Sequence, residues 1–371
     1  MAELDGENVP AYRKIRIAVP EEPVASLADV EAWRARETYP DILLDGHPVF
    51  GVAKERMEGG WELVSSLSSL EPQEARDSMG SVFRLAARTA REAGDPAGHD
   101  AYTSAAERMD REAVDEVTVR GVRYRVVRAE RFLRGGPQGP EPPRPTDADP
   151  MEPGDSHRAP DPADGFVIDP FTATGMSEGI LKMELLSLVR KEGAVPKAVR
   201  DDSVRATETH PGRVLLPAVF GTAEYTDGRW RPDSAGASTT PQGARDTLAM
   251  KLRVMIPWQQ DLTPEERAPY TAAADRLDAA RCDELEVLSL RFRVVRMERL
   301  VRIGPDGPEG PRPSDPDSTP PVKVQDERLR AQGVGTDDED APIELDGPTR
   351  RLADLFHEEE ARREAERPRK R

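Results

Sequence analysis

Two stretches of this sequence are crowded with arginine and repeat the same spacing 168 residues apart. The first holds Arg123, Arg125, Arg128, Arg131 and Arg134 beside one acid, Glu130. The second holds Arg291, Arg293, Arg296, Arg299 and Arg302 beside Glu298. A guanidinium group is a planar fork of donors that matches carboxylate and phosphate groups. The pattern suggests a surface for an acidic protein or a phosphate-bearing ligand. The predicted binding residues are Arg123, Arg125, Arg128, Arg291, Arg293 and Arg296.

A second interpretation makes these arginines structural. They would pair with the chain's own acids, or solvate an open sheet face, and contribute little to recognition. The sequence leaves both interpretations open and favours the structural one. If the strips do serve a partner, alternation along the strand places them on the solvent side.

One motif resembles a catalytic serine turn. Gly175 to Gly179 reads G-x-S-x-G, and Asp201 or Asp202 and then His210 follow Ser177 in the order of an α/β-hydrolase. However, no βαβ alternation surrounds the motif. Such short patterns also arise by chance, and Thr174 or Ser177 capping the next helix explains it equally simply. We therefore predict no catalytic residue and lean against an enzyme.

Other chemistries find little support. The five histidines are scattered, and His357-Glu358-Glu359 lacks the second histidine of a zinc helix because position 361 is Ala361. No glycine-rich phosphate loop is present, and the single cysteine, Cys282, excludes an intramolecular disulfide. We predict no metal and no cofactor.

The arginines belong to an internal duplication, which also predicts the elements that hold them. Residues 123–149 and 291–317 agree at 18 of 27 positions. Before and within each copy, apolar residues alternate with polar ones, which predicts a β-hairpin. Each copy then becomes a proline-rich arm, 137–149 or 305–317, that cannot continue a sheet. Both arms fit an SH3-ligand pattern, but we favour an arm folded back over its own or its sister unit.

Further matched pieces extend the repeat upstream. Val49-Phe50-Gly51 matches Val219-Phe220-Gly221, and Trp61 matches Trp230. Within each copy, these two pieces predict a first hairpin. A helix begins at Pro72, with Val82, Leu85, Ala86 and Ala90 at helical spacing, and a second helix follows. The predicted fold class is α+β, with two homologous β-β-α-α-β-β repeats. Their antiparallel sheets would be related by a pseudo-twofold axis, with a helical insert and a C-terminal helical tail added.

These patterns divide the chain into five segments. They are an N-terminal lead-in (1–34), repeat one (35–150), a linker with an amphipathic helix (151–205), repeat two (206–322) and an acidic, partly helical tail (323–371). Within them we expect a helix from Ser26, as its N-cap, to about Glu37, and another from Ile180 to Val189. A tail helix begins at Pro348-Thr349 with Leu352, Leu355 and Phe356 as its apolar residues.

Taken together, these motifs resemble those of a known family. The arginine stretch, the V-F-G hairpin, the P-Q-x-A-R-D helix start and the proline-rich arm are similar to those of uncharacterised two-repeat proteins of high-GC Gram-positive bacteria. That family is catalogued only as a domain of unknown function. The resemblance covers most of the chain and implies no activity and no catalytic residue.

Composition limits the remaining choices. The net charge is −17, from 53 basic and 70 acidic residues, which argues against general nucleic-acid or anionic-membrane binding. No signal pattern or run of 18 apolar residues is present, so cytoplasm is the expected location. The predicted function is a non-catalytic cytoplasmic interaction or scaffold protein. The alternative is a small-molecule-binding protein or hydrolase with a site between the two repeats.

Overall fold

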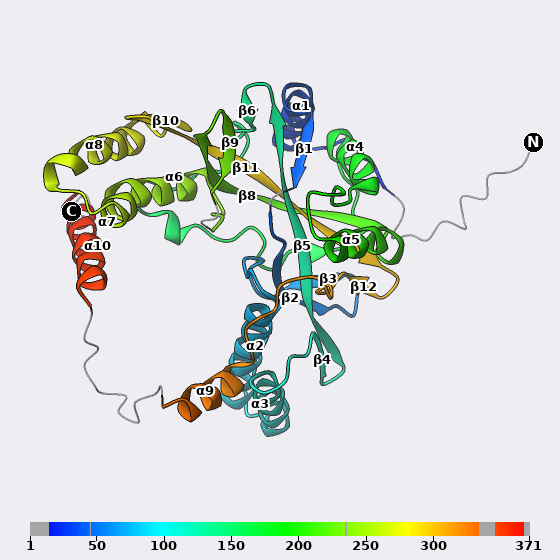
Figure 1. Cartoon of the computed structure of the whole chain (residues 1–371). Coiled ribbons are helices and arrows are strands. Elements are labelled where there is room, and N and C mark those ends of the chain that lie inside the picture. Colours follow the sequence, from blue (N-terminus) through cyan, green and yellow to red (C-terminus); the bar gives the residue numbers. More distant parts are fainter. Residues whose placement is uncertain (1–14, 45, 234–235, 334–345, 367–371) are drawn as a thin grey trace, which may run out of the picture. The chain divides into compact units, whose positions relative to one another are not determined.

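The computed structural model describes residues 15–44, 46–233, 236–333 and 346–366 and shows a mixed α+β protein with antiparallel strand pairing (Figure 1). Its described residues form two compact units, each discontinuous in sequence. Unit 1 takes residues from 1–134, 161–218 and 298–335, and unit 2 takes those from 135–160, 219–297 and 336–371. Three long strands contribute residues to both units: β5 (Val122–Gly136), β8 (Gly212–Thr226) and β11 (Leu290–Gly304). The predicted repeat boundaries stay a prediction.

The sheet of unit 1 follows the strand order β7, β3, β2, β5, β11, β8. Its shorter members are β7 (Val167–Ile168), β3 (Trp61–Leu63) and β2 (Val49–Glu55). The predicted hairpin is present. Strand β4 (Glu116–Val119) pairs antiparallel with β5, and Val119 lies opposite Val122. The turn between them, Arg120-Gly121, has φ angles of 52° and 81°, as a two-residue hairpin turn of this hand requires. Strands β1 (Asp41–Leu44) and β12 (Gly307–Pro308) pair with β5 and β11.

Two helices cover one face of this sheet. Helices α2 (Pro72–Glu92) and α3 (Pro96–Met109) pack on each other and on β2, β4 and β5. The predicted apolar face of α2 is correct in part: Val82 packs against the core, but Leu85 is 56% exposed, and Met79 and Phe83 are the fully buried residues. Phe83 packs edge-on against Tyr124 of β5 with ring centroids 4.9 Å apart, so this aromatic contact sets the orientation of the helix.

Unit 2 repeats this order of elements. Strand β9 (Arg229–Pro232) pairs with β8, and β10 (Glu284–Val287) pairs with β11. Helices α6 (Pro241–Met250), α7 (Ile256–Gln259) and α8 (Pro264–Ala280) pack against Phe292 and Leu285 of the two strands. Between α6 and α7 the backbone forms a π-helical turn, η5 (Lys251–Met255). Pro257, in the first turn of α7, lacks the N–H that would bond to the carbonyl oxygen of Arg253, which accounts for the irregular hydrogen bonding of the helix at this point.

The remaining elements correct several predicted boundaries. Helix α1 spans Pro23–Thr38, so it begins with a proline in its first turn and Ser26 is not its N-cap. The predicted helix from Ile180 to Val189 is instead α4 (Met176–Glu184) followed by a 3-10 turn, η4 (Leu185–Ser187). The other elements are α5 (Lys197–Thr209), α9 (Val322–Ala331), α10 (Gly347–Glu366), η3 (Ser156–Arg158) and β6 (Gly139–Pro140).

In unit 2, helix α10 buries only part of the apolar side that the sequence predicts for it. Leu355 is buried, but Phe356 is 42% exposed. The helix is also held by Glu359, which is buried and pairs with Arg253 of η5. None of the described helices is long and apolar enough to cross a membrane.

Gly307 is a position where the fold requires glycine. Its φ is +117°, and a Cβ added there would lie 2.6 Å from Nε1 of Trp61. We expect Gly307→Ala to lower the free energy of unfolding by at least about 1–2 kcal/mol, measured by urea denaturation. Gly347→Ala is the control, because a Cβ at Gly347 meets nothing within 4 Å, and its effect should stay within about 0.5 kcal/mol. Equal effects of the two changes would contradict this account.

Candidate functional site

In unit 1, two of the predicted binding arginines lie over a tryptophan. The guanidinium carbons of Arg123 and Arg125 are 5.3 and 5.0 Å from the ring centroid of Trp61. This Trp61 cluster is closed by acids on both sides. Glu116 of the neighbouring strand accepts hydrogen bonds from both arginines, and so does Asp306 of the arm 305–317. The bond from Arg125 and the nearby positive charges lower the pKa of Asp306, so the ion pairs hold at neutral pH.

Unit 2 contains the corresponding Trp230 cluster. The guanidinium carbons of Arg291 and Arg293 are 5.3 and 4.8 Å from the centroid of Trp230. Both arginines pair with Glu284, and Arg293 also donates to the carbonyl oxygen of Pro140 in the arm 137–149. Arg125 makes the same contact with Pro308 in unit 1. The two clusters are therefore built from the same parts.

The Trp61 cluster and the Trp230 cluster differ in one acid from the arm. The arm residue before Gly307 is Asp306, whereas the residue before Gly139 is Gln138, which is exposed and uncharged. In unit 1, Nε of Arg125 donates to Glu116 at 2.7 Å, but Nε of Arg293 has no acceptor among the described residues. In the Trp230 cluster, Glu284 is the carboxylate that both arginines share, and Arg291 also pairs with the exposed Glu286 at 3.4 Å.

A solvent-facing position was expected for the arginine strips if they serve a partner, and four of the six side chains are largely buried. The side chains of Arg125, Arg128, Arg293 and Arg296 are only 11, 3, 6 and 11% exposed. The reason is that an arm covers each strip and supplies its acids. Asp315 pairs with Arg128 in unit 1, and Asp147 pairs with Arg296 in unit 2.

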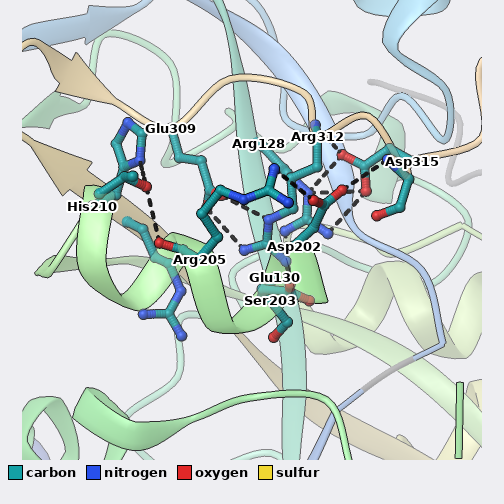
Figure 2. A network of polar contacts seen from close by, with 12 residues as sticks. Arg128, Glu130, Asp202, Ser203, Arg205, His210, Glu309, Arg312 and Asp315 are labelled. Carbon is teal, nitrogen blue, oxygen red and sulfur yellow. Dashed lines mark hydrogen bonds and ion pairs between the residues drawn. The ribbon is translucent and has the colours of Figure 1, made fainter. Parts of the chain in front are cut away.

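Around Arg128 the contacts form a buried ionic network in unit 1 (Figure 2). Glu130 accepts hydrogen bonds from Arg128 at 2.7 Å, from Arg312 of the arm at 3.0 Å, and from Arg190 at 2.7 Å. Arg312 also donates two hydrogen bonds to the Glu309 carboxylate, at 2.7 and 3.0 Å. The network thereby fastens the arm to β5, so its residues hold the fold together.

Helix α5 adds a second attachment for the arm. The Asp202 carboxylate accepts a hydrogen bond from the backbone N–H of Ser314 at 3.0 Å and pairs with Arg205. Ser203 accepts one from the backbone N–H of Arg190, also at 3.0 Å. Figure 2 shows these side chains beside Glu309 and Arg312. Burial alone would raise the pKa of Glu130, but the charges of Arg128, Arg190 and Arg312 outweigh it and hold that pKa well below the usual range.

Among the described residues, two arginines next to this network form no ion pair with a carboxylate, although Glu309 and Glu130 lie near Arg302. Arg213 donates to the carbonyl oxygens of Leu185 and Leu186, and Arg302 donates to that of Leu188 at 2.5 Å. Both are buried, with 7 and 2% of their surface exposed. Burial and the charge of Arg302 lower the pKa of Arg213 to about 10. Within the described residues, Nη1 of Arg213 and both Nε and Nη1 of Arg302 have no acceptor.

The catalytic-serine motif is used structurally. Ser177 lies inside the first turn of α4 and donates its hydroxyl to the carbonyl oxygen of Asp29 at 2.7 Å, so it is not a helix cap. Asp201 pairs with Lys197, and His210 contacts the hydroxyl of Thr209 at 2.9 Å. Burial lowers the pKa of His210. These contacts give Ser177 no base.

Unit 2 also contains a cavity of about 770 Å³. Its wall carries hydroxyl groups from Thr222, Ser238 and Thr247, together with Lys251 and Met255 of the π-helical turn. π-Helical turns occur often at functional sites, because they move side chains out of their regular helical positions. A search of the described residues for three or more His, Cys, Asp or Glu side chains placed to hold a metal ion finds none.

Comparisons with known proteins yield one match. The model of a family described as "Family of unknown function (DUF5954)" matches residues 22–318. No curated protein and no solved structure matches. The expected resemblance to an uncharacterised family is confirmed, while the bacterial group and the two-repeat character of that family stay predictions.

Glu130 is the residue on which the ionic network depends. We expect Glu130→Gln to lower the free energy of unfolding at pH 7 by about 3–5 kcal/mol, because it leaves buried arginines without their acid. The folded pKa of Glu130 is lowered, so its contribution is complete above about pH 4.3, the ordinary glutamate pKa, and is lost as the pH falls further. Urea denaturation from pH 7 to pH 3 should show the gap between wild type and variant narrowing.

Glu58→Gln serves as the control, because the Glu58 side chain is 73% exposed in its pair with Arg56. Its effect should stay within about 0.5 kcal/mol at every pH. A Glu130→Gln variant as stable as this control would show that the network does not hold the arm.

Proposed function

We propose that this chain, which belongs to the DUF5954 family of unknown function, is a non-catalytic interaction protein that binds an acidic protein segment. The residues of the chain itself support this proposal. The observation that supports this is the missing acid of the Trp230 cluster. Gln138 stands where Asp306 neutralises the other cluster, so Arg291 and Arg293 have one carboxylate fewer. The cytoplasmic location remains part of the proposal.

The chemistry of the cluster suits a carboxylate from outside. The Arg291 side chain is 40% exposed, against 26% for Arg123, so an incoming group reaches it without unfolding the arm. The cation–π contacts with Trp230 restrain both guanidinium groups, which reduces the side-chain entropy lost on binding. A glutamate of the partner would take the place that Asp306 occupies in unit 1. Arg123, Arg125, Arg128 and Arg296 then serve mainly as structural residues in the proposal.

Exchanging the arm residues tests this proposal. A fluorescent peptide of eight glutamates serves as the probe in an anisotropy titration at low salt. We expect Gln138→Asp to weaken binding several-fold, because the new carboxylate fills the cluster from within. Replacing Arg291 and Arg293 together by Gln should weaken it about tenfold, or about 1.4 kcal/mol. Asp306→Gln should strengthen binding by opening the second cluster.

Arg123→Gln is the matched control, since it removes an arginine whose acids are already in place. Its affinity for the peptide should stay near that of the wild type. If Gln138→Asp and the double variant bind as the wild type does, the Trp230 cluster is not the binding surface.

We also propose that the two predicted repeats are homologous. Corresponding contacts recur in the two units, and one example joins a helix, a hairpin and an arm. Arg76 pairs with Asp115 and Asp317, and Arg245 pairs with Asp283 and Asp149. The pseudo-twofold relation remains a prediction.

The cavity of unit 2 supports a second candidate function, a small-molecule-binding protein. Its volume of about 770 Å³ lies in the range of pockets that enclose small ligands, roughly 300–1,000 Å³. We expect a thermal-shift screen of polar metabolites to find compounds that raise the melting temperature. Met250→Trp, which fills the cavity, should abolish that rise. A rise unaffected by this change would exclude the cavity as the site.

A further inference from the structure

The outer face of helix α2 in unit 1 combines an exposed leucine with charged side chains. Five residues, at about 100° per residue, fall within about 100° of one another around the helix: Asp77, Ser81, Arg84, Leu85 and Arg88. The Arg84 side chain is 49% exposed and Leu85 is 56% exposed. Asp77, Ser81 and Leu85 also line a cavity of about 420 Å³. A single exposed leucine is common at protein surfaces, so its exposure alone assigns no role to this face.

Unit 2 contains a helical segment that corresponds to α2. Helices α2 and α6 both begin with the sequence P-Q-x-A-R-D, which ends in Asp77 or Asp246. In each helix, Nε2 of the glutamine donates to Oδ1 of that aspartate at 2.9 Å. Counted from this aspartate, Arg84 corresponds to Arg253 of η5. The correspondence rests on the proposed homology of the two repeats.

The corresponding face in unit 2 is covered by helix α10. The Arg253 side chain is only 4% exposed, and Val254, the counterpart of Leu85, is fully buried. Helix α10 packs against η5 and α7 (Figure 1). Leu355 of α10 is buried, and Glu359, one turn later, pairs with Arg253 at 3.5 Å. The same face of a helix is therefore covered in one unit and open in the other.

A third residue of α10 belongs to its contact side. Arg363 follows Glu359 by four residues and lines the cavity of unit 2 to which Asp246 also belongs. Leu355, Glu359 and Arg363 are spaced four residues apart, so they share one side of the helix. In unit 1 the cavity on α2 contains the matching acid, Asp77. Helix α10 thus shows which side chains suit a face of this kind.

Arg84 has fewer acids than its counterpart. Arg253 pairs with two acids of α8 as well as with Glu359. Arg84 pairs with Asp110 and forms no second ion pair within the described residues. Helix α9 reaches Asp110 through Lys323 and still leaves the Arg84 side chain half exposed. A glutamate from outside can therefore reach the Arg84 guanidinium group, as Glu359 reaches Arg253.

We propose that this face of α2 binds an amphipathic helix of another protein, in which a leucine, a glutamate and an arginine follow one another at spacings of four residues. The leucine packs on Leu85 beside the cavity, the glutamate pairs with Arg84, and the arginine faces Asp77. The chain's own α10 occupies the corresponding face of unit 2, which favours a separate protein as the occupant in unit 1. The site uses no residue of the Trp230 cluster, so either proposal can fail without the other.

A fluorescent peptide of residues 347–366, which has the α10 sequence, tests the site in an anisotropy titration of the full chain. Binding should be saturable, with one site per chain. Leu85→Asp should weaken binding by at least about tenfold, because it replaces the apolar contact by a charge. Arg84→Gln should weaken it by about threefold to tenfold, because it removes the partner of the glutamate. Both positions are exposed, so these variants should keep the melting temperature of the wild type.

Two further variants of unit 1 are matched controls. Leu27→Asp changes a leucine of α1 that is 49% exposed, and Arg108→Gln changes an arginine of α3 that is 47% exposed and pairs with Glu112. Both should bind the peptide as the wild type does.

A changed peptide tests the direct contact between the glutamate and Arg84. The peptide with Glu359→Gln should bind the wild type about as weakly as the original peptide binds Arg84→Gln. Combining the two changes should cause little further loss, because the effects of residues in contact are not additive. Losses that multiply fully would contradict the pairing of the two residues.

The remaining outcomes would overturn the proposal. If Leu85→Asp and Arg84→Gln bind the peptide as tightly as the wild type, the peptide has exchanged into the α10 site of unit 2. A wild type without saturable binding would show that the face accepts no such helix. Sedimentation equilibrium tests the remaining occupant. Self-association of the wild type that Leu85→Asp abolishes would assign the face to α10 of a second copy instead of another protein.

Discussion

The interaction on which unit 1 most depends is the burial of Glu130 among arginines. Taking a carboxylate and a guanidinium group out of water is unfavourable unless each finds a well-placed partner. Strand β5 carries its arginines into the interior, so acids must come from elsewhere in the chain. The arm 305–317 supplies them as Glu309 and Asp315. It also brings Arg312, which donates to the same oxygen of Glu130 as Arg128 does. The proline-rich character of the arm follows, since an extended segment without a sheet ladder lays its side chains across a strand face.

Much of the fold was accessible from the sequence because it depended on local patterns. The alternation around Val122, Tyr124 and Val126 placed Tyr124 and Val126 in the core and Val122 at its margin, and the Arg120-Gly121 pair marked the hairpin turn. The antiparallel pairing and the helix after Pro72 followed for the same reason. Local signals failed where tertiary contacts decide. Leu85 and Met79 are both apolar at helical spacing, and only the position of Tyr124 selects the face that includes Phe83.

The sites were less accessible, because they depend on residues far apart in sequence. The arginine pattern singled out Arg128, but nothing local showed that Asp315, 187 positions later, would bury it. Arg213 lies in neither arginine-rich stretch, so nothing in the sequence indicated that it would be buried against the carbonyl groups of Leu185 and Leu186. The one usable signal in the sequence is the pair of arms, in which Gln138 stands where the other arm has Asp306. The meaning of that difference comes only from the contacts around Trp230.

The contact between Arg76 and Asp317 spans 241 residues and has a consequence for how the protein is made. A ribosome releases the chain from its N-terminus, so most of unit 1 emerges long before the arm that neutralises it. Until residue 317 has left the exit tunnel, β5 carries arginines with few acids, and its face lacks a cover. Long-range closure of this kind slows folding and extends the lifetime of incomplete states. Nascent chains therefore pass through a period in which this basic strand face waits for the acids that will cover it.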